Sequence, residues 1–149
     1  MKRHKHNPLD CLPHPKRRGE WVELKFMAEA AGRGLTVLKP YGDSSRFDCV
    51  VKSGSSLLKV QVKSVSTLRN YSYRCTLKSG RRYVPYSSHE IDFVVVYVVP
   101  CDTWYIIPAR NAVGKKIIGL FPHHPSRGRY EKYREAWHLL LVPPPARRR

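Results

Sequence analysis

Acidic residues are scarce in this sequence. Its 149 residues include 11 Asp and Glu but 28 Lys and Arg, so the formal net charge is +17. No Asp or Glu occurs from Cys49 to His89. A single-sign excess of this size creates a field that attracts polyanions, and it predicts nucleic acid as the partner. A basic surface that only keeps the protein in solution is the alternative.

Long apolar runs and paired cysteines are also lacking. The longest apolar run, Phe93–Val99, is far too short to cross a bilayer, and no signal-like apolar stretch follows the basic start of the chain. We therefore expect no membrane contact and a cytoplasmic location. The four cysteines are scattered without a CxxC pair, and the His and Cys residues of positions 1–14 have no standard zinc-finger spacing. Reduced thiols are the expectation.

The composition along the chain predicts one folded domain between two basic arms. Residues 1–17 and 143–149 are rich in Pro, Lys and Arg and show no hydrophobic periodicity, so we expect both segments to be flexible. A chain of this length with 42% hydrophobic residues can bury one core. We place that core in residues 18–142.

Helical and strand patterns both occur within the domain, which predicts an α/β fold. Good helix formers over Gly19–Arg33 predict the first helix, and Arg129–Leu139 also has helical spacing. Leu35–Leu38 is predicted to be a short strand. Ile91–Val99 is β-branched and apolar on both faces, as in a central strand, with Trp104–Ile107 as its hairpin neighbour.

Residues 46–63 predict a β-hairpin that carries polar residues on one face. With the turn centred at 54–55, the numbers of opposed residues sum to 109, so Asp48 lies opposite Gln61 and Lys63 shares their face. The reverse face is predicted to be core, and it comprises Phe47, Cys49, Val51, Leu58, Val60 and Val62.

This polar face is a candidate metal site. Opposed side chains have Cβ atoms about 5 Å apart, so the Asp48 carboxylate and the Gln61 amide oxygen can hold one hard cation, with the Val62 carbonyl as a third ligand. Mg²⁺ accepts such oxygens and can activate a bound water beside a phosphate. Lys63 would orient or deprotonate that nucleophile, or neutralise charge developing on the phosphorus centre. Because polar residues also occupy the solvent face of any amphipathic hairpin, the spacing alone leaves both interpretations open.

The acid-free stretch beside the hairpin is a candidate DNA contact. Its only strand-like segment is Tyr73–Leu77, and its tyrosines interleave with cations, as in phosphate contacts combined with groove contacts or base stacking. Structural tyrosines at sheet edges are the alternative. The candidate DNA-binding residues are Lys59, Arg69, Tyr71, Arg74, Lys78, Arg81 and Arg82.

Several of these motifs follow the order found in the PD-(D/E)XK nuclease superfamily, which the sequence resembles. They are Gly19-x-x-x-Glu23, Pro40-Tyr41-Gly42, Arg46-Phe47-Asp48-Cys49-Val50-Val51 and Gln61-Val62-Lys63-Ser64. Downstream, Ile91-Asp92-Phe93 and Trp104-Tyr105-Ile106-Ile107-Pro108 are similar to the branch that contains intron-encoded homing endonucleases of bacteria. The resemblance covers about residues 18–141.

The resemblance implies a restriction-endonuclease-like core, with a central mixed β-sheet flanked by helices. It implies catalytic roles for Asp48 as the motif aspartate, for Lys63 as the catalytic lysine and for Glu23 as the helix glutamate, with Glu20 as the competing carboxylate. Gln61 takes the second acidic position, which leaves less negative charge for a metal. The residue before Asp48 is not the proline that names the motif.

These observations predict a Mg²⁺-dependent DNA endonuclease, with Mn²⁺ as a substitute ion. The branch implies cleavage of double-stranded DNA, by a homo-oligomer that is a dimer or a tetramer. Two alternatives stay open: a protein that binds DNA or RNA without cutting it, and a structure-selective nuclease such as a Holliday junction resolvase.

Overall fold

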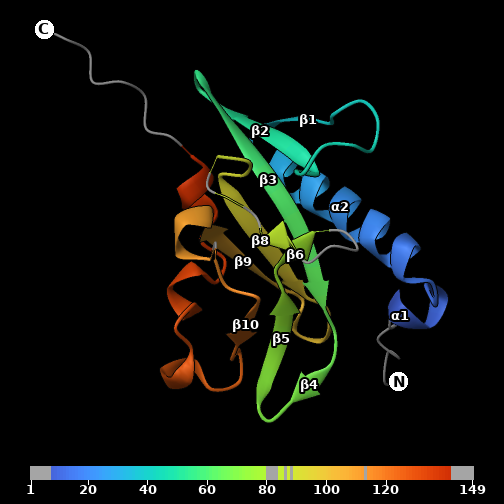
Figure 1. The fold of residues 1–149 in the computed structure, drawn as a ribbon, viewed down its shortest axis with the longest axis vertical. Coiled ribbons are helices and arrows are strands. Elements are labelled where there is room, and N and C mark those ends of the chain that lie inside the picture. Colours follow the sequence, from blue (N-terminus) through green and yellow to red (C-terminus); the bar gives the residue numbers. More distant parts are fainter. Residues whose placement is uncertain (1–7, 80–83, 86, 88, 113, 142–149) are drawn as a thin grey trace, which may run out of the picture.

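The computed structural model describes residues 8–79, 84, 85, 87, 89–112 and 114–141. Figure 1 shows a long helix on one side of a twisted sheet and smaller strands and turns on the other side. No helix in the described part of the chain is long and apolar enough to span a membrane.

Two helices begin the described chain, α1 (Pro8–Cys11) and α2 (Pro15–Gly32). Proline suits the first turn of α2 because the backbone N–H it lacks would have no partner there. Residues 8–17 were predicted to belong to a flexible arm, and this is wrong for the helical part, where Leu9 packs against the core. The rest of the predicted arms, 1–7 and 143–149, lies outside the described residues.

The central sheet is mixed, as the resemblance implied. Its order is β1-β2-β3-β8-β9, in which β3 and β8 run parallel and all other neighbours are antiparallel. The strands are β1 (Thr36–Leu38), β2 (Cys49–Ser53), β3 (Ser56–Val65), β8 (Phe93–Val98) and β9 (Thr103–Pro108). The predicted short strand, the hairpin and the central strand with its neighbour are therefore confirmed.

A second, smaller sheet of order β10-β5-β4 covers the face of the central sheet opposite α2 (Figure 1). It consists of β4 (Leu68–Arg69), β5 (Ser72–Thr76) and β10 (Ile117–Leu120). A two-stranded ladder joins β6 (Lys78–Ser79) and β7 (Val84–Pro85). The turns are η1 (Val99–Cys101), η2 (Ala109–Asn111), η3 (Pro125–Arg127), η4 (Glu131–Tyr133) and η5 (Trp137–Leu140).

The central sheet is therefore buried on both faces. One core lies under α2 and includes Phe26, Val51 and Val60, whereas the other lies under the small sheet and includes Val94 and Tyr105. The polar face of the hairpin, which was predicted to face solvent, is largely withdrawn from it: Gln61 is only 8% exposed, and Asp48 and Lys63 are half-buried. Burying a polar side chain costs free energy unless it is hydrogen-bonded, so a buried glutamine is expected to have a bonding partner.

One residue of the predicted hairpin core lies on the wrong side. Phe47 precedes the first residue of β2 and packs against the core under the small sheet, whereas Cys49 and Val51 pack under α2. The strand begins later than the sequence pattern predicts, so the alternation of faces does not extend back to Phe47.

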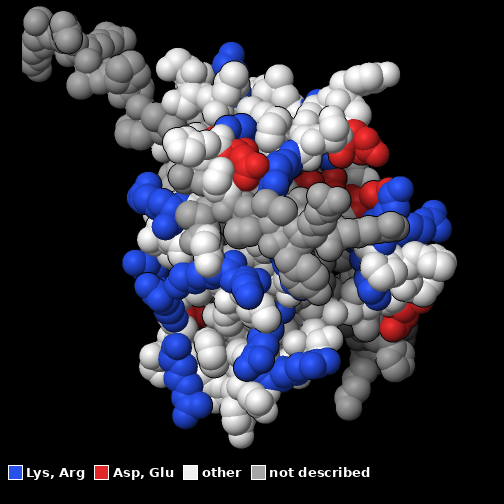
Figure 2. All heavy atoms as spheres, viewed as in Figure 1, with Lys and Arg blue, Asp and Glu red and all other residues white. Residues whose placement is uncertain are grey.

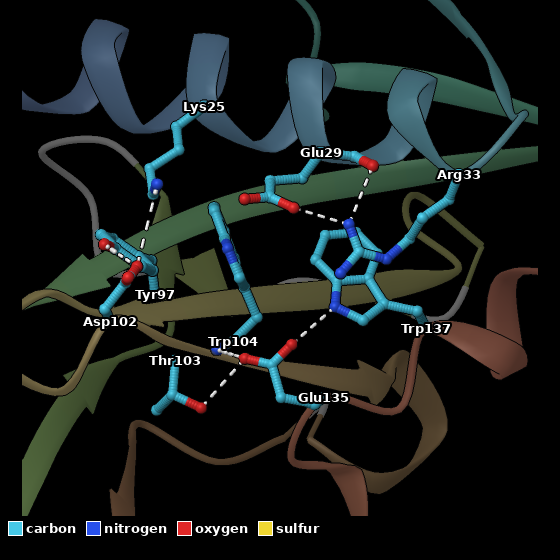
Figure 3. A network of polar contacts seen from close by, with 9 residues as sticks. All are labelled: Lys25, Glu29, Arg33, Tyr97, Asp102, Thr103, Trp104, Glu135 and Trp137. Carbon is cyan, nitrogen blue, oxygen red and sulfur yellow. Dashed lines mark hydrogen bonds and ion pairs between the residues drawn. The ribbon is translucent and has the colours of Figure 1, made fainter.

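The predicted helix at Arg129–Leu139 is wrong, because the segment forms two short 3₁₀ turns separated by a bond to β9. Glu135 has a left-handed backbone with φ of 49°, and its N–H donates to the Trp104 carbonyl at 2.7 Å. Its carboxylate accepts bonds from the Trp104 N–H and the Trp137 Nε1, each at 2.7 Å (Figure 3). These bonds to an edge strand replace the helical hydrogen bonds that the spacing had suggested.

Candidate functional site

The hairpin β2–β3 has the predicted register. Cys49 lies opposite Val60 and Ser53 opposite Ser56, so the paired numbers sum to 109. Just before β2, the Asp48 N–H continues the ladder by donating to the Val60 carbonyl at 2.9 Å. Asp48 is thereby fixed beside the middle of β3.

Asp48 is hydrogen-bonded to Gln61, its predicted partner across the hairpin, and to Val62, the residue after Gln61. Its Oδ2 accepts one bond from Gln61 Nε2 and one from the backbone N–H of Val62, both at 2.7 Å. Oδ1 of Asp48 and Oε1 of Gln61 are not used in these bonds. The pair therefore presents two oxygen atoms that can serve as ligands for a hard cation.

Glu23 comes from α2 and faces the same site. Gly19 lies one turn earlier on the helix, and residues four apart share a helix face, so the absence of a side chain at Gly19 leaves the approach to Glu23 open. The Glu23 carboxylate forms an ion pair with Lys39, which follows β1. Glu20, the competing carboxylate, is exposed and lies on an adjoining part of the cleft.

Lys63 reaches the site from β3 and is half-buried. Its Nζ donates to the Lys78 carbonyl at 3.4 Å, which ties the end of the cleft to the segment after β5. The charge of Lys63 is close enough to lower the pKa values of both Asp48 and Cys75, although burial raises each of them more.

One cleft contains all four residues that were predicted to be catalytic. Its lining includes Glu23, Asp48, Gln61 and Lys63, together with Val62. A second hollow adjoins it, and Gly19, Glu23 and Asp48 line both. The structure thus brings together residues from α2, from the position just before β2 and from β3, which are separated by up to forty positions in the sequence.

The electrostatics of the cleft are those of a crowded carboxylate site. Burial raises the pKa of Asp48 from 3.8 to about 6, and the Glu23 carboxylate adds to the rise. The bond from the Val62 N–H and the charges of two lysines work in the opposite direction without cancelling it. A cation placed between these carboxylates would offset the cost of ionising Asp48.

The donor set fits a magnesium or manganese ion. No group of three or more His, Cys, Asp or Glu side chains suited to a metal occurs among the described residues. A metal would therefore rest on the carboxylates of Asp48 and Glu23 together with neutral oxygens of Gln61 and Val62. Oxygen ligands in small number are what Mg²⁺ accepts, because it keeps several of its waters.

The predicted DNA-binding residues fall into three groups. Arg69, Tyr71 and Arg74 are exposed on the β4–β5 hairpin. Lys59 and Lys78 are half-buried, and Lys59 Nζ donates to the His89 carbonyl at 2.5 Å. The last two candidates, Arg81 and Arg82, lie outside the described residues.

Sequence reasoning missed Lys39 as a part of the site. Lys39 lies 16 positions from Glu23, at the far end of the β1 strand, and lines the hollow next to Asp48. A periodic pattern cannot link a helix to the residue that follows a strand, because their contact depends on how the helix crosses the sheet. The only available signal was that Lys39 precedes the Pro40-Tyr41-Gly42 motif.

Comparisons with known proteins agree with this geometry. The family model described as PD-(D/E)XK endonuclease matches residues 13–140. Among solved structures, the chain is similar to the bacterial homing endonuclease I-Ssp6803I, with 31% identity, a TM-score of 0.75, and coverage of 85% of this chain and 93% of that chain. This similarity confirms the restriction-endonuclease-like core.

A weaker similarity involves the Holliday junction resolvase Hjc from the archaeal hyperthermophile Archaeoglobus fulgidus. It has 15% identity and a TM-score of 0.48 over 70% of this chain and 84% of that chain, which is too low to decide anything about fold or function. No curated protein matches the sequence. The family match spans most of the chain and includes every residue of the cleft. The chain therefore belongs to the PD-(D/E)XK endonuclease family.

Proposed function

We propose that this protein is a Mg²⁺-dependent DNA endonuclease that cuts both strands of double-stranded DNA, as homing endonucleases do. The observation that carries the proposal is the cleft in which Asp48, Gln61, Glu23 and Lys63 converge, in a chain with a net charge of +17. Carboxylates are otherwise rare in this basic protein, and two of them, Glu23 and Asp48, line the same cleft. Mn²⁺ is expected to replace Mg²⁺.

The residues of the cleft have two proposed roles at the scissile phosphate: some hold the ion, and Lys63 acts on the attacking water or the phosphate oxygens. Asp48, Glu23 and the oxygens of Gln61 and Val62 would hold the ion, which when bound supplies a Lewis acid and an activated water. The two bonds to Asp48 Oδ2 fix that carboxylate in place, so it needs no rearrangement when the substrate arrives. Lys63 is positioned to orient the attacking water or to neutralise charge on the phosphate oxygens.

The β4–β5 hairpin is proposed as the element that contacts a DNA groove. Its two-residue turn places Asn70 and Tyr71 at φ values of 47° and 65°, a region that costs a non-glycine residue free energy. Glycine would normally follow Asn in such a turn, yet a tyrosine stands there with 62% of its surface exposed. A two-stranded ribbon fits the major groove, and Arg69 and Arg74 flank this tyrosine with positive charge.

Double-strand cleavage also supports an oligomer. The described part of the chain carries one set of the proposed catalytic residues, in the cleft, and two strands of opposite direction call for two such sets. We therefore propose a homo-oligomer, a dimer or a tetramer. Light scattering of the purified protein, alone and with duplex DNA, measures the number of chains; a single chain per cut duplex would contradict this part of the proposal.

The experiment that tests the function incubates the purified protein with supercoiled plasmid, linear duplex and a four-way junction, each with Mg²⁺ and with a chelator. We expect Mg²⁺-dependent conversion of plasmid and linear duplex to products cut in both strands. Binding without cutting under any ion would support the non-catalytic alternative. Cleavage confined to the junction would instead support a structure-selective nuclease.

A further inference from the structure

The C-terminal part of the chain forms a pocket that is separate from the cleft. It lies between η2, the loop before β10 and the segment around η4. Its lining consists of four basic residues, one amide and two tyrosines: Arg110, Lys115, Arg129, Lys132, Asn111, Tyr130 and Tyr133. We call it the basic pocket.

No carboxylate lines the basic pocket in the described part of the chain. The sequence has no Asp or Glu between Asp102 and Glu131. Glu131 is the nearest acid along the chain, but its Oε1 accepts a bond from Tyr105 at 2.6 Å and its Oε2 pairs with Arg134 at 3.8 Å. Four cations therefore share one concave site without a neutralising partner in its lining, which concentrates positive potential there.

Two of the cations are supported by buried aromatic rings. Lys115 Nζ lies 5.7 Å from the centre of the Tyr130 ring, and Lys132 Nζ lies 5.1 Å from that of Tyr133. The Tyr130 hydroxyl donates to the Asn111 carbonyl at 3.4 Å, while the side-chain Oδ1 of Asn111 is buried with no partner among the described residues. The contacts with the rings limit the freedom of the two lysines, so binding an anion costs little further ordering of them.

Two hydrogen bonds, one from a side chain and one between backbone groups, connect the cleft to the segment that lines the basic pocket. The Nζ of Lys63, in the cleft, donates to the Lys78 carbonyl at 3.4 Å. The residue before Lys78 is Leu77, whose N–H donates to the Lys116 carbonyl at 2.9 Å. Lys115, which precedes Lys116, lines the pocket.

Basic side chains also extend from the pocket toward the β4–β5 hairpin. Strand β10 pairs with β5, where Gly119 lies opposite Arg74, and β5 pairs with β4, where Arg69 lies opposite Ser72. Figure 2 shows Lys and Arg gathered over β4, β5, β10 and the adjoining C-terminal segments, whereas most Asp and Glu lie in the upper and right-hand parts of that view. An extended series of cations suits a chain of phosphates better than a single small anion.

We propose that the basic pocket binds the phosphate backbone of duplex DNA away from the position of the cut. This inference rests on the proposed function only in taking DNA as the ligand. The pocket supplies affinity and fixes the direction in which the duplex leaves the cleft, since phosphate contacts position a protein on DNA. It has no carboxylate in its described lining and takes no part in the chemistry.

The test measures binding in the absence of a divalent ion, so that cleavage plays no role. The double variant Lys115→Ala/Arg129→Ala is compared with wild-type protein and with Lys52→Ala/Lys25→Ala, which removes the same charge from β2 and α2. Fluorescence anisotropy is measured with a labelled duplex of about 30 base pairs across a range of salt concentrations. A duplex of this length extends beyond the cleft, because the domain is roughly 40 Å across. Circular dichroism and the melting temperature confirm that each variant is folded.

We expect the pocket variant to bind more weakly than the control variant at low salt. Its dependence of log affinity on log salt should be shallower by about 2, because two phosphate contacts are lost. If the two double variants bind alike, the basic pocket is not a DNA contact, even if the protein cuts DNA. If the pocket variant loses only binding of inorganic phosphate, measured by calorimetry, the site takes a free anion and the proposal is overturned.

The failure of this proposal and that of the proposed function are distinguishable. If the pocket variant binds DNA more weakly and with a shallower salt dependence than the control variant, but the wild-type protein never cuts DNA, the pocket is a DNA contact and the nuclease proposal is overturned. Should Lys115→Ala/Arg129→Ala fail to fold, Arg110→Ala/Lys132→Ala repeats the test, since both side chains are exposed and the loss of either leaves no cavity.

Discussion

The cleft and the basic pocket use charge in opposite ways. In the cleft, the carboxylates of Asp48 and Glu23 are half-buried beside lysines, Glu23 is paired with Lys39, and burial together with the Glu23 charge raises the pKa of Asp48. In the basic pocket, charges of one sign line a concave surface, three of the four side chains are exposed, and none faces a carboxylate of the described lining. Burial strengthens electrostatic interactions, which is useful for chemistry, whereas exposed charges chiefly provide affinity that salt can screen.

The largest expected effect is the loss of cleavage when a charge is removed from the cleft. Lys63→Ala and Asp48→Ala should each slow Mg²⁺-dependent cutting by at least about a hundredfold, because preorganised charge at the reacting phosphate contributes that much. DNA affinity should stay near that of the wild-type protein, since the exposed cations are unchanged. Cleavage assays and anisotropy on the same preparations measure the two quantities, and cleavage that persists in either variant would remove that residue from the site.

The next largest effect concerns stability, and it follows from the cost of ionising Asp48. Its pKa is about 6 in the folded protein but near 3.8 when the carboxyl is solvated. The folded state therefore holds the proton more tightly, so the unfolding free energy falls as pH rises through the interval between these values. Asp48→Asn removes the cost and keeps the size of the side chain.

Above pH 6, Asp48→Asn should therefore be more stable than the wild type by about 3 kcal/mol, because the wild type must ionise a carboxyl whose pKa is raised by burial. The difference should shrink as pH falls below 6 and vanish only well below pH 3.8, where Asp48 keeps its proton in both states. Urea unfolding at several pH values measures it. A variant that is less stable than the wild type at pH 7.5 would show that Asp48 stabilises the fold, and the contrast between cleft and pocket would then lose its basis.

A smaller effect is expected from restoring the acid that Gln61 replaces. Gln61→Glu would lose the bond from Nε2 to Asp48 Oδ2 and place a second carboxylate beside it, which raises the demand for a cation. Mg²⁺ and Mn²⁺ affinity should rise about tenfold, because a carboxylate is the better ligand. Calorimetry that finds equal or weaker binding would argue that Gln61 is not a ligand.

The smallest effect is expected at Gly19, whose lack of a side chain leaves the cleft open. A Cβ at this position meets no atom within 4 Å, so Gly19→Ala should raise the unfolding free energy by about 1 kcal/mol through helix propensity. If the substrate passes close to α2, cutting should slow while stability increases. Thermal unfolding and cleavage rates measured on the same sample check both, and faster cutting would contradict a close approach.

The sequence predicted best those parts of the molecule in which local pattern and tertiary structure agree. The hairpin register, and with it the pairing of Asp48 and Gln61, follows from a turn position and a period of two residues. The sequence therefore sufficed to predict that Asp48 and Gln61 lie close enough to interact. The central strand was recognisable because apolar residues on both faces are typical of burial on both sides.

The remaining features depended on contacts between segments far apart in the chain. Glu135 leaves a helical pattern because Trp104 and Trp137 offer its carboxylate better partners. The small sheet is held together by the pairing of β10 with β5, two segments that no local sequence pattern connects. The cations of the basic pocket come from two segments that meet only in the folded chain, so their charges could be counted in the sequence but not placed.

Every role proposed for the residues of the cleft around Asp48 requires that the protein cuts DNA with a divalent ion. The most direct test is the rate at which supercoiled plasmid becomes linear, measured with Mg²⁺ or a chelator for wild-type protein and for Asp48→Asn purified in parallel. We predict linear product only for the wild type with Mg²⁺, or with Mn²⁺ in its place. No product from the wild type under either ion, or an equal rate from Asp48→Asn, would contradict the proposed role of the cleft.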